Sequence, residues 1–111
     1  MRAKEFIIEA NVIGSTSVGE YHIDIDSHFR DRMIFRKVRE VDAYSALNKI
    51  NNAKAKIKTL APGQSFWLYD NTNNVSLGIK MTDFDKKIYL LKTALPGKPQ
   101  SDRNYPIFDV A

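Results

Sequence analysis

The sequence predicts a small α+β domain in which two helices cover one face of a small antiparallel sheet. Residues 27–50 carry helical periodicity, and residues 65–93 hold three strand-like runs separated by turn-forming residues. A chain of 111 residues is long enough for one hydrophobic core but not for two. We therefore expect one domain over residues 1–111, with a partly irregular tail over residues 95–111.

The composition narrows the class of protein. With 43% hydrophobic and 27% charged residues, the chain has the balance of a globular protein. It has no cysteine, which excludes disulfides and thiolate metal sites. Without an apolar run of signal-peptide or membrane-span length, we expect a cytoplasmic protein with no membrane partner. The net charge of +4 and the pI near 9.4 favour an acidic partner such as nucleic acid.

The N-terminal part predicts a β-hairpin. Residues 4–13 are rich in β-branched side chains and alternate, which favours a strand. Residues 14–19, Gly-Ser-Thr-Ser-Val-Gly, predict a turn or short loop. Residues 20–26 alternate Tyr or Ile with His or Asp, which predicts a half-buried second strand.

A first helix follows the hairpin. Either Asp26 or Ser27 can cap a helix that begins near His28, by accepting hydrogen bonds from its free N–H groups. Phe29 and Met33 are four residues apart and form the inward row of this helix.

A second row of the same helix is basic. His28, Arg32 and Arg36 recur at four-residue spacing. Such a row is most often a solvated edge. Two features favour a phosphate site instead: the histidine lies near the helix start, where free N–H groups attract anions, and two guanidinium groups suit phosphate oxygens.

A second helix is predicted from about Glu40. Its apolar face consists of Ala43, Tyr44, Ala46, Leu47 and Ile50. Residues 53–60 then carry Lys54, Lys56 and Lys58 at alternate positions, which favours an exposed edge strand. These lysines either discourage edge-to-edge pairing or form a basic track for a phosphate backbone.

The core sheet is predicted from three runs. Residues 65–69, 75–81 and 87–93 indicate an antiparallel meander, because the segments between them are rich in Asp, Asn and Thr. Gly78 in the middle run leaves room for a close approach. The tail is expected to be irregular until Ile107, where the chain docks again.

The motifs of common metal and nucleotide enzymes are absent from the sequence. Two histidines six residues apart make a poor metal site, and Asp24, Asp26 and Asp31 fit capping or solvated roles better than cation binding. We therefore expect neither a metal site nor a cofactor.

A metal-free ribonuclease needs a base for the ribose 2′-OH, an acid for the departing oxygen and cations for the phosphorane. His28 suits proton transfer because the unperturbed pKa of histidine lies near neutrality. Arg32 and Arg36 suit the phosphate. Single-stranded RNA is usually read by stacking, although an aromatic residue of the sheet can equally belong to the core. The candidate rings are Trp67, Tyr69 and Tyr89.

Residues 27–50 also resemble the helix pair of the phage RegB endoribonucleases, which share the RelE/ParE toxin-like fold. The family pattern is S-x-H-x-x-D-R-x-I-x-R, then a hydrophobic helix ending near H-K-I. This chain has DSHFRDRMIFR, with the serine shifted by one, and Asn-Lys-Ile at residues 48–50. Residues 95–98, Leu-Pro-Gly-Lys, resemble the LPGK that closes the family's sheet. The resemblance covers roughly half of the chain.

The resemblance implies a sequence-selective, metal-independent endoribonuclease. Its partner would be mRNA, either free or ribosome-associated, and cleavage would leave a 2′,3′-cyclic phosphate and regulate translation in the cytoplasm of a phage host. His28 and Arg32 carry over as catalytic residues, and Asn48 takes the place of the family's second histidine. The predicted RNA-binding residues are Arg36, Lys54, Lys56, Trp67, Tyr69 and Lys98.

Asn48 is the main departure from the family, because an amide cannot exchange a proton. Either His22 or Tyr69 supplies that group, or the protein binds RNA without efficient cleavage. Two alternatives follow: a non-catalytic RNA- or ribosome-binding regulator on the same scaffold, and a phage host inhibitor whose basic helix docks on an acidic protein. The sequence does not indicate an oligomeric state.

Overall fold

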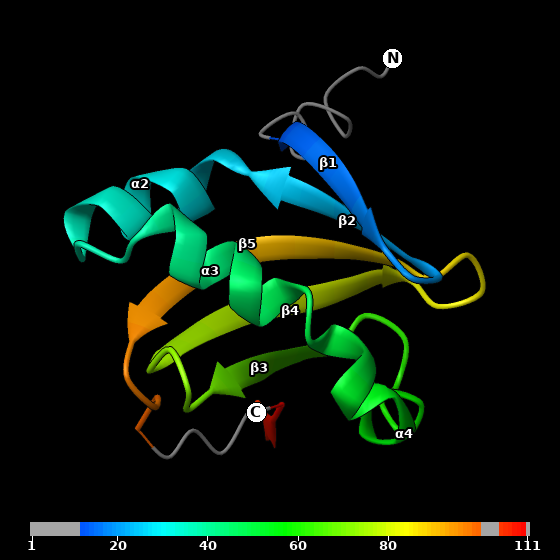
Figure 1. Cartoon of the computed structure of the whole chain (residues 1–111). Coiled ribbons are helices and arrows are strands. Elements are labelled where there is room, and N and C mark those ends of the chain that lie inside the picture. The colour runs from blue at the N-terminus through cyan, green and yellow to red at the C-terminus, as the bar shows by residue number, and fades with distance from the viewer. Residues whose placement is uncertain (1–11, 101–104, 111) are drawn as a thin grey trace.

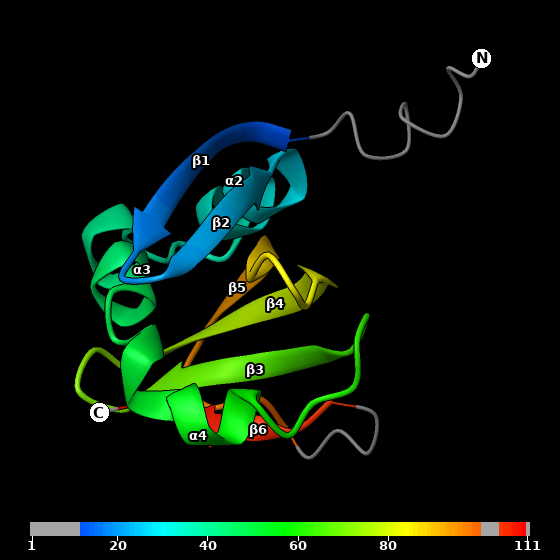
Figure 2. The same cartoon turned by 90° about the vertical axis from the view of Figure 1, so that its right-hand side faces the viewer.

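A mixed six-stranded sheet forms the frame of the protein, which a computed structural model describes over residues 12–100 and 105–110 (Figure 1). The order across the sheet is β1-β2-β5-β4-β3-β6. Figure 2 shows β1 and β2 at one end of the sheet and β3 and β6 at the other. With helices packed on this sheet, the α+β class is confirmed. The strands are β1 (Val12–Val18), β2 (Tyr21–Asp26), β3 (Ser65–Asp70), β4 (Val75–Asp83), β5 (Ile88–Pro96) and β6 (Ile107–Asp109).

The prediction of a purely antiparallel sheet is wrong, because β2 lies parallel to β5 and β3 lies parallel to β6. Both parallel pairs join strands that are far apart in the sequence, as parallel pairing requires a long connection. The antiparallel meander of β3, β4 and β5 is confirmed. An N-terminal hairpin is present as well, but its first strand is not the predicted one. The docking of the tail near Ile107 is also confirmed, as β6.

β1 occupies a segment for which the sequence predicted a loop. Most of the strand predicted over residues 4–13 lies outside the described residues, whereas β1 runs from Val12 through the Gly-Ser-Thr-Ser segment. Most β1 side chains are exposed at the sheet edge, so small polar residues suffice and the backbone ladder with β2 holds the strand. Gly19, with a φ of 59°, makes the turn into β2.

The two predicted helices are confirmed. α2 (Ser27–Phe35) starts after Asp26, whose carboxylate accepts a hydrogen bond from the backbone N–H of His28. α3 (Glu40–Leu47) buries Ala43, Ala46 and Leu47 of the expected apolar face, and it ends before Ile50. Among the helices of the described residues, none is both long and apolar enough to cross a membrane.

The edge strand predicted over residues 53–60 is wrong, because this segment is helical. A short 3-10 turn, η1 (Ile50–Ala53), leads into α4 (Lys54–Ile57). The lysines between the buried positions are exposed and fit a solvated helix as well as a strand. The helical spacing of the apolar residues therefore decides the structure. The buried residues are Ile50, Ala53, Ile57 and Leu60.

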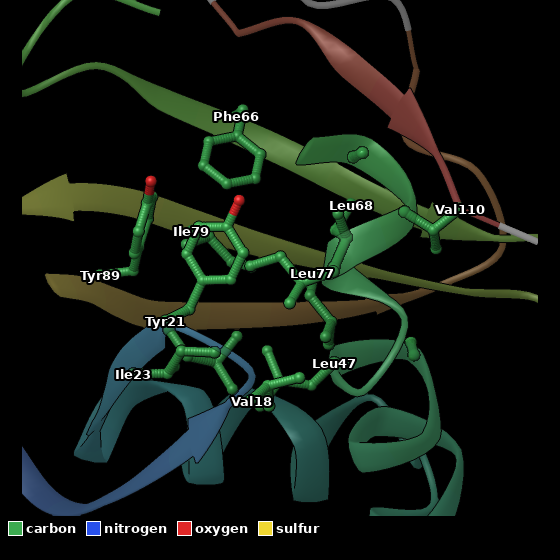
Figure 3. Packing of buried hydrophobic residues seen from close by; sticks show 14 of the residues in the cluster. Val18, Tyr21, Ile23, Leu47, Phe66, Leu68, Leu77, Ile79, Tyr89 and Val110 are labelled. Carbon is green, nitrogen blue, oxygen red and sulfur yellow. The ribbon is translucent and has the colours of Figure 1, made fainter. Parts of the chain in front are cut away.

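The core lies between the helices and one face of the sheet. Figure 3 shows Leu47 of α3 on the helix side and Leu77 and Ile79 of β4 on the strand side. Tyr89 of β5 points into the same core, where burial raises its pKa to about 12. Alternate strand residues point to the opposite side of the sheet. We call that side the open face and define it by Trp67, Gly78 and Thr93, which are paired across β3, β4 and β5.

α2 takes the place of a strand beside the second half of β5. β2 pairs with β5 only as far as Leu91, and the chain then turns into α2, which packs along the rest of β5. The Arg36 guanidinium Nη1 donates to the carbonyl oxygen of Ala94 at 2.9 Å and to Oγ1 of Thr93 at 3.3 Å. An edge carbonyl that a strand would otherwise satisfy is thus bonded by a side chain, and this bond fixes α2 against the sheet.

A buried carboxylate ties the helices to the β3–β4 turn. Asp70 is fully buried, and its Oδ2 accepts from Lys49 Nζ at 2.9 Å and from Asn73 Nδ2 at 2.7 Å. Its Oδ1 accepts from the Thr72 N–H at 3.0 Å. Burial by itself would raise the pKa of Asp70, but the hydrogen bonds from Lys49 and Asn73 outweigh burial and hold this pKa below its usual value.

The lowered pKa of Asp70 predicts a loss of stability in acid. Because the unfolded chain takes up the Asp70 proton at a higher pH than the folded chain, the ionised group stabilises the fold above about pH 4. This contribution is lost as the pH falls through the folded-state pKa. In urea unfolding, Asp70→Asn should be less stable than wild type at neutral pH, and the difference should shrink in acid. A difference that grows in acid would contradict this assignment.

Candidate nucleic-acid interface

A hollow of about 420 Å³ lies where α2 meets the open face of the sheet. We call it the His28 hollow. It brings together four of the residues predicted for the site, two from α2, one directly after α2 and one from β3, with side chains from the second half of β5. The lining residues are Asp26, His28, Arg32, Arg36, Trp67, Lys92, Thr93 and Leu95.

Asp26 orients the imidazole of His28. The Asp26 Oδ1 atom lies 3.1 Å from both the backbone nitrogen and the ring Nδ1 of His28. Because a carboxylate only accepts, Nδ1 carries a proton, and in the neutral ring Nε2 keeps a free lone pair. The His28 side chain is 60% exposed, against 13% for Asp26. The largely buried Asp26 therefore holds the His28 ring in an orientation that exposes Nε2 to the solvent.

Three cations line the same hollow, and they are held differently. Arg36 is partly buried and anchored to β5 through Thr93 and Ala94. Arg32 is exposed one turn before it on α2, and Lys92 is half-buried on β5. Within the described residues, no ion pair engages any of the three. The three side chains form a positive surface beside the imidazole, and this surface is suited to phosphate oxygens.

A β-bulge puts two consecutive residues of β5, Lys92 and Thr93, on the same side of the sheet. Thr93 pairs with Gly78 and Leu91 pairs with Ile79, so Lys92 is the extra residue between them. A bulge re-aims a side chain, and both Lys92 and Thr93 line the hollow although they are consecutive. Lys92 was not among the predicted site residues. Alternation with the buried Tyr89 and Leu91 places Lys92 on the open face, but it does not show that α2 lies beside Lys92.

Trp67 forms the far wall of the hollow. Its ring lies against Gly78, at which an added Cβ would come within 3.3 Å of Trp67 Cζ3. The side chain is half-buried, and its Nε1 has no hydrogen-bond partner among the described residues. Trp67 thus belongs to the wall of a surface hollow on the open face. As the single tryptophan of the chain, it is also a built-in fluorescent reporter for this hollow.

Gly78 is expected to tolerate no side chain. A Cβ there would also lie 2.6 Å from Thr93 Cγ2, and Thr93 cannot turn away without disturbing its bond to Arg36. Gly78→Ala should therefore destabilise the fold by about 1–3 kcal/mol, the usual cost of overpacking, and shift the Trp67 emission. Gly14→Ala is the matched control, since no atom lies within 4 Å of a Cβ at Gly14. Equal effects of the two substitutions in urea unfolding would contradict this.

Several predicted site residues lie elsewhere. Asn48 caps the C-terminus of α3, is exposed, and does not line the His28 hollow. Lys54 and Lys56 are exposed on α4, and Lys54 Nζ lies 3.6 Å from Glu20. His22 donates from Nε2 to Asp24 Oδ1 at 2.9 Å and lies outside the lining.

Tyr69 and Lys98 form a separate pair. Tyr69 follows Trp67 by two positions on β3 and therefore faces the same side of the sheet. Lys98 Nζ lies 5.9 Å from the centroid of the Tyr69 ring. Neither lines the His28 hollow. Lys98 follows Gly97, whose φ of 76° and N–H bond to the Asn74 carbonyl, at 2.7 Å, close the end of β5.

Among the described residues, no three His, Cys, Asp or Glu side chains are grouped as metal ligands would be. Comparisons of the chain with protein-family models, with curated proteins and with solved structures found no match.

Proposed function

We propose that the chain is a metal-independent, sequence-selective endoribonuclease that cuts mRNA at the His28 hollow. One observation carries the proposal: an imidazole oriented by Asp26 shares a single hollow with three cations and an aromatic ring. Each group matches a need of RNA transphosphorylation, namely proton transfer, charge neutralisation and base stacking. The resemblance of residues 27–50 to RegB-type endoribonucleases supports the same chemistry.

The reaction that fits these groups is attack of the ribose 2′-oxygen on the adjacent phosphorus. Nε2 of His28 takes the 2′-OH proton, and the bond from phosphorus to the 5′-oxygen breaks. Lys92 gives a proton to the departing 5′-oxygen, and both side chains then recover their starting states by exchange with water. The products are a 2′,3′-cyclic phosphate and a 5′-hydroxyl, while Arg32 and Arg36 neutralise the phosphorane.

A single-stranded substrate fits the hollow better than a duplex. Trp67 offers its ring to an unstacked base, and bases are accessible for stacking mainly in single strands. In the cytoplasm the matching substrate is mRNA, free or on the ribosome, and cutting it would regulate translation.

The direct test is incubation of the purified protein with labelled, unstructured mRNA in EDTA, with and without ribosomes. Discrete cuts at preferred positions are expected. RNA that stays intact under both conditions would exclude the nuclease.

A non-catalytic RNA-binding regulator is the second candidate. The observation that favours it is the single histidine of the hollow, with Asn48 outside the lining. This candidate predicts salt-sensitive quenching of Trp67 fluorescence by RNA without any cutting. Discrete cleavage products from the purified protein would exclude it.

A further inference from the structure

A second hollow on the open face shares a wall with the His28 hollow. It has a volume of about 270 Å³, and we call it the Lys80 hollow. Asp26 and Lys92 line both hollows, so the two are contiguous across β5. The Lys80 hollow is lined by Val12, Asp24, Asp26, Lys80, Thr82, Leu90 and Lys92.

We propose that the Lys80 hollow binds the nucleotide next to the one held at His28, with Lys80 on its phosphate. This inference rests on the proposed function and deepens it, because it makes the substrate a continuous single strand of three or more nucleotides that crosses β5 towards β4. Lys92 lies between the two hollows and faces the phosphate that joins the two nucleotides.

The two carboxylates of the Lys80 hollow bond to histidines, so its lysines are available to bind phosphate. Asp24 is engaged by His22 at 2.9 Å and Asp26 by His28 at 3.1 Å. Lys80 is exposed, and within the described residues no ion pair engages Lys80 or Lys92. Two unpaired ammonium groups on one strip of surface favour successive phosphates of one chain, since each neutralised phosphate releases counterions.

The floor of the Lys80 hollow is suited to a nucleoside. Lys80 of β4 pairs with Leu90 of β5, so an apolar side chain lies directly beside the cation. Thr82 adds a hydroxyl, which already donates to the Ile88 carbonyl at 3.0 Å and keeps its lone pairs for a further donor. An apolar surface for the base beside a cation for the phosphate is the combination that single-strand binders use.

Uncleavable RNA tests this inference with the intact protein. Oligonucleotides of two and six residues, 2′-O-methylated so that they lack the attacking hydroxyl, are titrated while Trp67 fluorescence is followed. Lys80→Ala should weaken binding of the six-residue strand by about fivefold. The substitution should also make binding of the six-residue strand less sensitive to salt. The slope of log K against log salt concentration should decrease in magnitude by about 0.7, the value of one single-strand phosphate contact. Binding of the two-residue strand should not change.

Lys58→Ala is the matched control, because Lys58 is an equally exposed lysine next to α4, on the helix side of the sheet. Lys58→Ala should change the affinity for neither the two-residue nor the six-residue strand. Loss of affinity that is equal for Lys80→Ala and Lys58→Ala, or equal for both strand lengths, would overturn the inference and leave the nuclease standing. A wild-type protein that neither binds the six-residue strand nor cuts RNA would overturn both.

Discussion

Replacing His28 with alanine is expected to lower RNA cleavage by at least about 100-fold, the lower end of what a positioned acid–base group contributes. The imidazole is the side chain of the His28 hollow that Asp26 holds in place with its second ring nitrogen facing the solvent. The initial cleavage rate of a labelled RNA measures the loss. RNA binding, followed through Trp67, should change far less, because Arg32, Arg36 and Lys92 stay in place.

His22→Ala is the matched control for this experiment. His22 is the other histidine of the chain, it also donates to an aspartate two residues away, and it lies outside the His28 hollow. Its replacement should lower the cleavage rate far less than His28→Ala does. A large loss with His22→Ala and a small one with His28→Ala would move the proton-transfer role to His22.

Replacing Lys49 with methionine is expected to lower the free energy of unfolding by about 3 kcal/mol, as when one partner of a buried ion pair is removed. Asp70 is fully buried and Lys49 is 28% exposed, so little water can replace the lost ammonium. Methionine keeps most of the apolar stem, which separates the charge from the packing. Urea or thermal unfolding measures the change.

Arg39→Met is the control for the Lys49 experiment. Arg39 pairs with Asp42 at 3.0 Å, but its side chain is 75% exposed, so the pair is screened by water. Arg39→Met should lower the free energy of unfolding much less than Lys49→Met does. Similar losses of unfolding free energy for both variants would show that burial of Asp70 does not govern the strength of the Lys49–Asp70 ion pair.

Local periodicity predicted the parts of the fold that local contacts decide. The four-residue spacing of His28, Arg32 and Arg36 placed them on one side of α2, and all three line one hollow. The runs that became β3, β4 and β5 were visible because alternation and turn residues are local signals. The parallel pairings were not, since the sequence near β2 or β6 does not say which distant strand lies beside it.

Conflicting local patterns explain the remaining differences. In residues 53–60 the alternate lysines suggested a strand, whereas the buried spacing of Ile50, Ala53 and Ile57 is helical. Buried side chains decide such a conflict, because solvated lysines fit either structure. Lys92 was not predicted for another reason: alternation places it on the open face, but only tertiary packing brings α2 beside it.

The end groups of RNA treated with the protein in EDTA test the central claim most directly. Wild-type protein and His28→Ala are incubated side by side with one unstructured mRNA, and the termini of the fragments are identified. Fragments with 2′,3′-cyclic phosphate and 5′-hydroxyl ends from the wild type, and intact RNA from His28→Ala, are the predicted result. Intact RNA with the wild type, or the same fragments from both proteins, would contradict the assignment of RNA cleavage to His28.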